Sequence, residues 1–305
     1  MNQTTEITAK NVCNFLKKFA ADISIEDLKP VSDRHRGGDN FTFYYRDDAI
    51  LKIARNAYRA RLLKEAKLTE YLHTLSMPFT VAKPIMVHDT GFYAMFSRIN
   101  GSSLPIEALE TFTARELESF GKSLGTALTF LHRHKFPDEV LHHIPRAIDP
   151  FAVAIRDTRQ QLPFIAENAA EIDTNRWSEK LENLQGSLDQ KWAVVHTDLQ
   201  INHLFFVQEN LEQLAIIDFA DAVMHDPAAD LSEFAIEMYS NLPLDGVVAK
   251  QVIDGVLNHY QTDDPAIKEK IEFGLLVFEI GRTYQRITNS VGQPKDARSV
   301  YTSQI

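Results

Sequence analysis

The sequence predicts an α+β fold of two lobes, in which a small N-terminal β-sheet lobe with one main helix precedes a larger, mostly helical C-terminal lobe. Two patterns support this prediction. Aromatic or aliphatic residues alternate with other residues over 41–46 and 49–54, which is typical of paired strands. After about residue 100, apolar residues recur at helical spacing in long segments. We therefore expect an N-terminal lobe over 1–100 and a C-terminal lobe over 101–305.

The composition is that of a globular protein large enough for about two domains. Its 305 residues include 32 basic and 42 acidic side chains, for a net charge of −10. That balance argues against binding to a nucleic-acid backbone and suits a cationic partner, although solubility alone also explains it. Cys13 is the single cysteine, so no internal disulfide is possible, and the polar start MNQTTEITAK does not resemble a secretory signal. We expect a cytoplasmic protein that binds neither nucleic acid nor a membrane.

The N-terminal lobe is expected to combine two helices with a small sheet. Apolar spacing predicts a helix over about 8–20, and a turn-rich stretch with the paired glycines Gly37 and Gly38 follows it. FTFYYR and AILKIA are expected to form a hairpin. A second helix, over about 56–75, precedes two further strands, VAKPIMVHD and FYAMFSRI.

Long helices are expected to dominate the C-terminal lobe, after a linker at NGSS. Thr113 and Glu116 have the spacing of a capping box, in which each side chain satisfies a free backbone N–H at the start of a helix. An apolar stripe then continues to about residue 134. Further helices are expected at about 149–171, 175–186, 230–240, 245–260 and 265–288.

The strongest chemical signal lies around a second hairpin, formed by LFFV (204–207) and LAIID (214–218). Closing this hairpin brings His203, just before its first strand, next to Asp218, at the end of its second. Asp198 lies on the loop that leads into the hairpin, and we expect it, with His196, in the same small volume. Charged groups beside such apolar strands must be paired, metal-bound or functional, because burying them otherwise costs several kcal/mol.

The motif HTDLQINH followed by IIDF resembles the aminoglycoside phosphotransferase family of the protein-kinase-like fold. DPAADL after the second motif strengthens the likeness. AILKIA and LLKEAKLTEYL are similar to the strand and helix that carry a phosphate-binding lysine and its glutamate partner in that family, and GFYAMFSRINGSSL is similar to its hinge. The resemblance covers most of 35–235. Histidine at 203, where asparagine is commonest, is most like the aminoglycoside 2″-phosphotransferases.

The resemblance implies a nucleoside triphosphate, ATP or GTP, as co-substrate. Lys52 would contact its phosphates, and Glu65, or alternatively Glu70, would hold the lysine ammonium in place. A loop containing Gly37 and Gly38 would close over the phosphates, although it has no clear G-x-G-x-x-G pattern. Backbone groups near Ser97 and Ile99 would hold the purine.

The resemblance also implies Mg²⁺, with His203 and Asp218 as its ligands. Magnesium prefers oxygen ligands, so a histidine nitrogen is unusual, and the adjacent Asn202 is an alternative. Asp198 would accept or orient the proton of the attacking hydroxyl, as phosphoryl transfer needs positioning and neutralisation of charge. His196 would brace the loop.

An acidic group further along the chain supplies a candidate substrate contact. Asp230 and Glu233 have the spacing of a second capping box, which predicts a helix start. Glu233 and Glu237 share one helix face. A cationic amino sugar would favour this face beside Asp198, and Asp221 and Asp226 are further candidates for the entrance.

The predicted function is transfer of the γ-phosphate of ATP or GTP to a hydroxyl of an aminoglycoside-like substrate, as in antibiotic-resistance enzymes. A metabolite kinase acting on choline, homoserine or a ribose derivative is the alternative, because fold likeness does not determine the substrate. A metal-dependent hydrolase would also use a set of His and Asp residues, but it leaves Lys52 and Glu65 without a role. A binding protein that has lost catalysis does not account for intact Lys52, Asp198 and Asp218.

Overall fold

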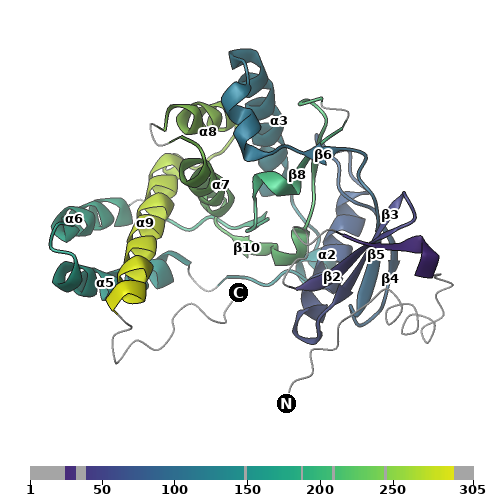
Figure 1. The fold of residues 1–305 in the computed structure, drawn as a ribbon, viewed down its shortest axis with the longest axis horizontal. Coiled ribbons are helices and arrows are strands. Elements are labelled where there is room, and N and C mark those ends of the chain that lie inside the picture. Colours follow the sequence, from purple (N-terminus) through teal and green to yellow (C-terminus); the bar gives the residue numbers. More distant parts are fainter. Residues whose placement is uncertain are drawn as a thin grey trace.

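The computed structural model describes residues 25–31, 39–147, 150–186, 188–207, 210–243 and 246–291. The helix predicted over 8–20, Cys13 and the paired glycines Gly37 and Gly38 lie outside these residues. Two parts are visible in Figure 1: a sheet with helix α2 against it, and a body of helices that includes α3, α7, α8 and α9. The predicted division into a sheet lobe and a helical lobe describes this arrangement.

The N-terminal lobe is built on a five-stranded antiparallel sheet with the strand order β1-β2-β3-β5-β4. The predicted hairpin is confirmed, because Asn40 pairs with Ala54 and Tyr45 with Ala49. Both further strands are present as well. The bounds are β1 (Leu28–Pro30), β2 (Asn40–Tyr45), β3 (Ala49–Ala54), β4 (Pro84–Val87) and β5 (Tyr93–Ser97).

Helix α2 (Arg59–Leu72) covers one face of this sheet. Successive side chains of a strand point to opposite faces, so Lys52 and Ala54 of β3 lie on the side of α2, whereas Leu51 and Ile53 join a cluster on the other side. Ala54 packs with Leu62 and other apolar residues of α2 and β5. The alternation of β3 therefore directs Lys52 to the same side as α2.

The chain passes to the second lobe directly after β5. Ser102 and Ser103, predicted to belong to a linker, instead form the short strand β6 (Ser102–Ser103), which pairs with Phe205 and Phe206. A Cβ atom on Gly101 would lie 2.6 Å from the carbonyl oxygen of Phe206, so this approach requires glycine. Pairing with Phe205 and Phe206 satisfies the backbone hydrogen-bonding groups of Ser102 and Ser103, which the sequence predicts to lie in a loop.

Helices make up most of the C-terminal lobe, as predicted. Thr113 and Glu116 form the predicted capping box: Glu116 N donates to Thr113 Oγ1 at 3.3 Å, and Thr113 N donates to Glu116 Oε2 at 2.7 Å. The bounds are α3 (Ala114–Arg133), α4 (Asp138–Leu141), α5 (Pro150–Asn168), α6 (Thr174–Gln185), α7 (Ala228–Asn241), α8 (Val247–His259) and α9 (Ile267–Val291), with short 3₁₀ turns η5 (Ile106–Thr111), η6 (Ile201–His203) and η8 (Phe219–Asp221). Two further 3₁₀ turns, η2 (Ile25–Asp27) and η4 (Asn56–Tyr58), belong to the N-terminal lobe.

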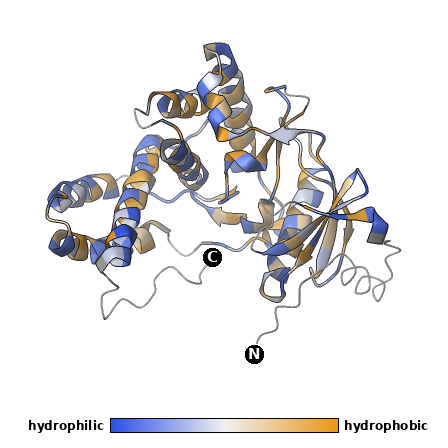
Figure 2. Ribbon diagram, viewed as in Figure 1, coloured by the Kyte–Doolittle hydropathy of each residue, from blue (hydrophilic) through white to orange (hydrophobic). Residues whose placement is uncertain are grey.

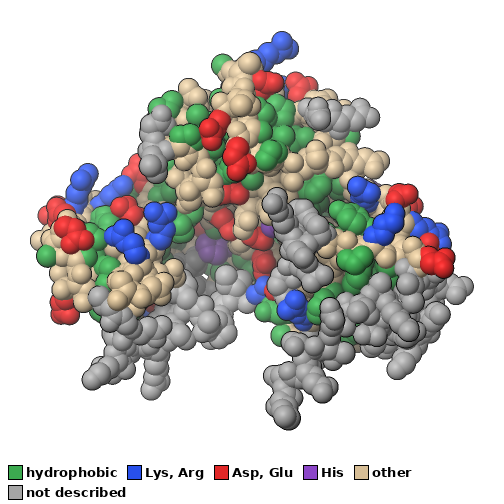
Figure 3. Space-filling model, viewed as in Figure 1, with side chains coloured by type: hydrophobic (Ala, Val, Ile, Leu, Met, Phe, Trp, Pro, Cys, Tyr) green, Lys and Arg blue, Asp and Glu red, His purple; other side chains and the backbone are tan. Residues whose placement is uncertain are grey.

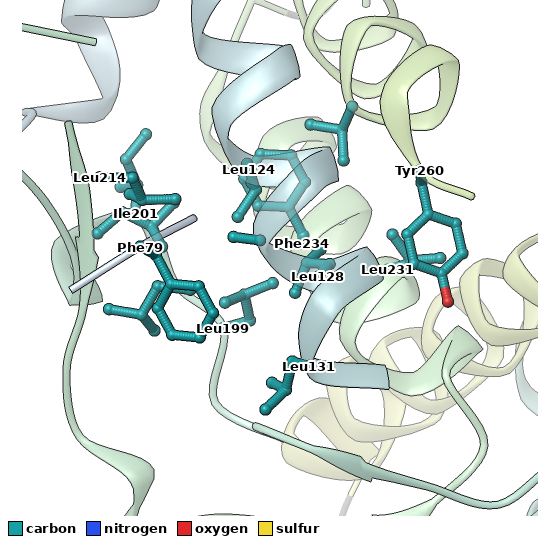
Figure 4. Packing of buried hydrophobic residues seen from close by; sticks show 14 of the residues in the cluster. Phe79, Leu124, Leu128, Leu131, Leu199, Ile201, Leu214, Leu231, Phe234 and Tyr260 are labelled. Atoms are coloured by element: carbon teal, nitrogen blue, oxygen red, sulfur yellow. The ribbon is translucent and has the colours of Figure 1, made fainter. Parts of the chain in front are cut away.

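The main hydrophobic core lies in this lobe and is organised around α3. Leu124, Leu128 and Leu131 are fully buried and pack with residues of α7, α8 and the second hairpin (Figure 4). Each buried leucine contributes about 1.5–3 kcal/mol relative to an exposed one. Helices α5, α6 and α9 enclose a separate cluster, and Figure 2 shows hydrophilic and hydrophobic residues on different sides of these helices.

The second predicted hairpin is confirmed. Strands β8 (Leu204–Phe206) and β9 (Leu214–Ile216) pair antiparallel, and β6 completes a three-stranded sheet. A separate pair, β7 (Ala193–Val195) and β10 (Val223–His225), was not predicted. Three-residue strands are too short to show alternation, so the sequence pattern carries little signal for them.

No helix in the described part of the chain is long and apolar enough to cross a membrane.

Candidate active site

A buried ion pair joins the N-terminal sheet to α2. Lys52 Nζ lies 2.7 Å from Glu65 Oε1 and 2.9 Å from Glu65 Oε2. The two side chains are 14% and 5% exposed, so the pair is largely removed from solvent. Glu70, the alternative partner, instead pairs with Lys67 at 3.0 Å on the exposed side of the helix. The structure therefore brings together the predicted Lys52 and Glu65.

Lys52 also reaches across to the second lobe. Its Nζ atom lies 2.9 Å from Asp218 Oδ1, so one ammonium contacts carboxylates from both lobes. Burial opposes the charge of Lys52, but Asp218 and Glu65 outweigh burial and raise the lysine pKa above its ordinary value. Burial also opposes the charge of Asp218, yet the attraction of Lys52 and His203 lowers the Asp218 pKa to about 2. Both groups are therefore charged at neutral pH.

Asp198 lies on the loop between β7 and η6. A side chain of α7 accepts hydrogen bonds from the backbone of this loop. Asp230 accepts hydrogen bonds from the backbone N–H of His196 at 2.9 Å and of Thr197 at 2.7 Å. Thr197 has a φ of +56°, which is strained for a β-branched residue. These bonds stabilise the strained turn directly before Asp198. The Asp198 carboxylate is partly exposed and accepts a hydrogen bond from Gln200 Nε2 at 2.7 Å.

His196 links this loop to the hairpin. Its ring Nε2 lies 2.8 Å from the carbonyl oxygen of Ile217, which directly precedes Asp218. The side chain is fully buried, and burial lowers its pKa. A neutral ring that donates from Nε2 holds the loops of Asp198 and Asp218 at a constant separation.

His203 faces both aspartates. Its Nδ1 atom lies 2.7 Å from the carbonyl oxygen of Asp198, and its Nε2 atom lies 3.9 Å from Asp218 Oδ2. A carbonyl only accepts hydrogen bonds, so Nδ1 carries a proton and the lone pair of a neutral ring is on Nε2. That lone pair and the Asp218 carboxylate converge on one point between them.

This donor set fits a divalent cation. Mg²⁺ is usually held by one or two carboxylates together with phosphate oxygens and water. Asp218 Oδ2 supplies one carboxylate oxygen, His203 Nε2 lies 3.9 Å from it as a nitrogen donor, and Asn202 lines the same cavity. Among the described residues, no group of three or more His, Cys, Asp or Glu side chains is arranged to hold a metal alone. The geometry therefore suits a metal that arrives together with a phosphorylated ligand.

A cavity of about 470 Å³ lies between the N-terminal sheet and the second hairpin. Lys52, Asp218 and His203 line one part, and Ser97 and Ile99 of the predicted hinge line another. Ser97 accepts a hydrogen bond on Oγ from Lys83 N at 2.8 Å, which ties the hinge to the chain before β4. The cavity therefore joins the predicted hinge to the predicted phosphate and metal ligands.

The structure corrects the prediction for Asp230. This residue was a candidate for substrate contact or helix capping, but it is fully buried, and its carboxylate accepts the two loop N–H groups. It does not cap α7 either, because α7 begins at Ala228 without a side-chain cap. Asp226 is likewise buried, against Lys270 Nζ at 2.8 Å, and does not line an entrance.

Glu233 and Glu237 lie beside the loop of Asp198. Glu237 Oε2 accepts from Ile201 N at 2.8 Å, and Glu233 Oε2 accepts a longer bond from Leu199 N at 3.4 Å. Burial, followed by repulsion from Asp230 and Asp198, raises the pKa of Glu233 to about 8. Burial also raises the pKa of Glu237. Both side chains are half-buried and have carboxylate oxygens available beyond these bonds. In Figure 3, acidic side chains and a histidine lie in a central hollow of the molecule.

Sequence reasoning missed two buried groups around the site. His132 of α3 places Nε2 3.0 Å from Asp230 Oδ2 and Nδ1 3.0 Å from the hydroxyl of Tyr260. The signal was present, since His132 lies four residues after Leu128 on the buried face of α3. The other is Lys64 of α2, whose Nζ donates to the carbonyl oxygen of Ala222 at 2.7 Å.

Comparisons with known proteins concern the family and the fold of the chain. A family model described as "Phosphotransferase enzyme family" matches residues 31–267. A search of curated protein sequences gives no significant match.

Solved structures with similar folds include the streptomycin–ATP ternary complex of APH(2″)-IIa, with 18% identity, a TM-score of 0.64 and coverage of 93% of this chain and 91% of that chain. The GDP complex of aminoglycoside 2′-phosphotransferase-IIIa has 14% identity, a TM-score of 0.67 and coverage of 93% and 94%. Macrolide 2′-phosphotransferase MphH from Brachybacterium faecium has 15% identity, a TM-score of 0.58 and coverage of 95% and 99%. These likenesses confirm the predicted kinase-like fold.

Proposed function

Because the chain belongs to the phosphotransferase enzyme family, we propose that it transfers the γ-phosphate of ATP or GTP to a hydroxyl of an aminoglycoside-like substrate. The observation that carries this proposal is the position of Lys52, whose Nζ contacts both Glu65 and Asp218 on the wall of the 470 Å³ cavity. A lysine ammonium binds phosphate oxygens as a point charge, and Glu65 holds this one at the cavity wall.

Each side chain has a distinct part in the proposed reaction. Lys52 binds phosphate oxygens, and Glu65 keeps its ammonium in place. Backbone groups near Ser97 and Ile99 hold the purine edge, and the phosphate-covering role expected of Gly37 and Gly38 concerns residues outside the described ranges. His203 and Asp218 would hold Mg²⁺, which when bound neutralises charge on the phosphate oxygens.

Asp198 orients the acceptor hydroxyl. A bond forms between the substrate oxygen and the γ-phosphorus while the bond from that phosphorus to the β-phosphate oxygen breaks, so the nucleoside diphosphate leaves. The hydroxyl proton passes to the Asp198 carboxylate and then to solvent. His196 and Asp230 keep Asp198 in position through the loop backbone.

An amino-sugar acceptor is supported by charge. Glu233 and Glu237 lie beside the loop of Asp198 with half-buried carboxyls, and an ammonium group beside them would favour their ionised forms. The net charge of −10 also attracts a cationic substrate. Solved structures with this fold include complexes with streptomycin, gentamicin and kanamycin.

The test is a nucleotide-consumption screen with ATP and GTP. Acceptors are aminoglycosides, a macrolide, choline, homoserine and ribose derivatives, and each active pair is checked by mass spectrometry for one added phosphate. We expect turnover with an aminoglycoside and resistance in cells that carry the gene. Phosphorylation of choline, homoserine or a ribose derivative alone would establish the metabolite kinase instead. Absence of transfer to every acceptor, with hydrolysis of a phosphate ester, would favour the hydrolase.

A further inference from the structure

A buried lysine with no part in the proposed reaction connects α2 to the segment that follows Asp218. Lys64 Nζ donates to the backbone carbonyl of Ala222 at 2.7 Å, and Lys64 is only 7% exposed. Lysine is rarely buried without a partner, because desolvating an ammonium is costly. Burial lowers the pKa of Lys64 to about 8. This cation therefore forms a specific interaction with one carbonyl of the other lobe.

The segment over 218–222 needs such support. Asp218 has a φ of +66°, a conformation that residues other than glycine adopt at a cost. The 3₁₀ turn η8 follows it, and Phe219 and Ala222 are fully buried. The backbone of residues 219–222 therefore determines the direction of the Asp218 carboxylate.

A second contact supports the same segment from the same helix. Arg61 Nη1 lies 2.8 Å from Asp221 Oδ1, and it also lies 2.7 Å from Asp39 Oδ2, directly before β2. The charged groups that act on Lys64 are Asp221 of η8, and Arg61 and Glu65 of α2 itself. Asp221 and Glu65 favour the ammonium form, and Arg61 opposes it.

We propose that Lys64 is a positioning residue, which holds the 218–222 segment against α2 and so fixes the Asp218 carboxylate for the metal–nucleotide complex. The proposal rests on the role of Asp218 in the proposed function. Lys52 holds Asp218 at the beginning of the segment, and Lys64 holds Ala222 at its end. Glu65 and Lys64 are neighbours on α2, so one turn of this helix sets both the phosphate-binding lysine and the metal ligand.

The experiment measures binding of mant-ATP and mant-GTP by fluorescence, at increasing Mg²⁺, in the full chain. Lys64→Met removes the donor and keeps much of the volume, whereas Lys64→Arg keeps a permanent charge. Lys67→Met is the matched control, since Lys67 is an exposed lysine on the same helix. We expect Lys64→Met to weaken Mg²⁺-dependent affinity about tenfold, because a charged hydrogen bond is lost. Lys64→Arg and Lys67→Met should stay within about threefold of wild type.

The pH dependence gives a readout that a general loss of stability would not produce. Wild-type affinity should fall more steeply between pH 7 and 9 than the affinity of Lys64→Arg, because Lys64 loses its proton in this range and arginine does not. If circular dichroism shows that Lys64→Met is unfolded, the comparison of wild type with Lys64→Arg tests the inference instead.

The inference would be overturned, and the proposed function left standing, if wild type and Lys64→Arg had the same pH dependence, or if Lys64→Met bound nucleotide like Lys67→Met. Wild-type protein that binds neither nucleotide would overturn the proposed function, and this inference with it.

Discussion

Replacing Asp230 tests how the loop of Asp198 is held. In the Asp230→Ala variant, the backbone N–H groups of His196 and Thr197 and the ring of His132 lose their common acceptor in a fully buried place. A buried donor left without a partner costs about 1–3 kcal/mol, and three donors lose their acceptor in this variant. We expect Asp230→Ala to lower the free energy of unfolding by about 3–5 kcal/mol. This is less than the summed cost of the unpaired donors, because relaxation of the structure and entry of water satisfy some of them.

Urea unfolding followed by circular dichroism measures this change. Asp230→Asn keeps one acceptor oxygen and should lose about 1–3 kcal/mol. Asp263→Ala is the matched control, because this carboxylate is 87% exposed, pairs with Arg133 at 3.2 Å and should contribute less than about 0.5 kcal/mol. An Asp230→Ala variant that unfolds at the same urea concentration as the control would refute the argument that this carboxylate holds the loop.

Four further predictions concern the site. Asp198→Asn should abolish phosphoryl transfer while nucleotide still binds, as measured by turnover and by mant-nucleotide fluorescence; retained turnover would remove Asp198 from its role. Asp218→Ala should lose the Mg²⁺ dependence of nucleotide affinity, and a magnesium titration identical to wild type would contradict the assignment. His203→Asn should keep substantial activity, since either side chain supplies a ligand, and a complete loss would give this histidine another role. Glu233→Gln tests how the stability of the protein changes with pH. The pKa of Glu233 is about 8 in the folded protein and 4.5 ordinarily, so between these pH values the folded protein keeps a proton that the unfolded chain has lost. The stability of the wild type therefore falls as the pH rises through this window. The variant should therefore gain stability relative to wild type from pH 5 to pH 8 in urea unfolding, and a difference that is constant with pH would show that Glu233 does not titrate in this way.

Much of the fold and part of the site could be predicted from local pattern. Period-two alternation identified the hairpin that directs Lys52 toward α2, and helical spacing placed Glu65 on the adjoining helix. Two apolar runs on either side of a polar turn predict the second hairpin, and its closure alone places His203 close to Asp218. These contacts follow from short connections, because a hairpin or a strand followed by a helix leaves few arrangements to choose from.

Other parts of the site depend on which side of a helix meets a distant loop. Asp230, Glu233 and Glu237 lie within two turns of α7. Their spacing in the sequence does not show that Asp230 is a buried hydrogen-bond acceptor whereas the two glutamates lie beside the loop of Asp198. Lys64 is one of several basic residues between positions 55 and 67, and nothing in the local sequence distinguishes it from the others. Only the packing between the lobes buries it against Ala222. Local periodicity specifies the elements and the faces they can bury, whereas the partner of a buried charge is set only when segments far apart in the chain pack together and desolvate it.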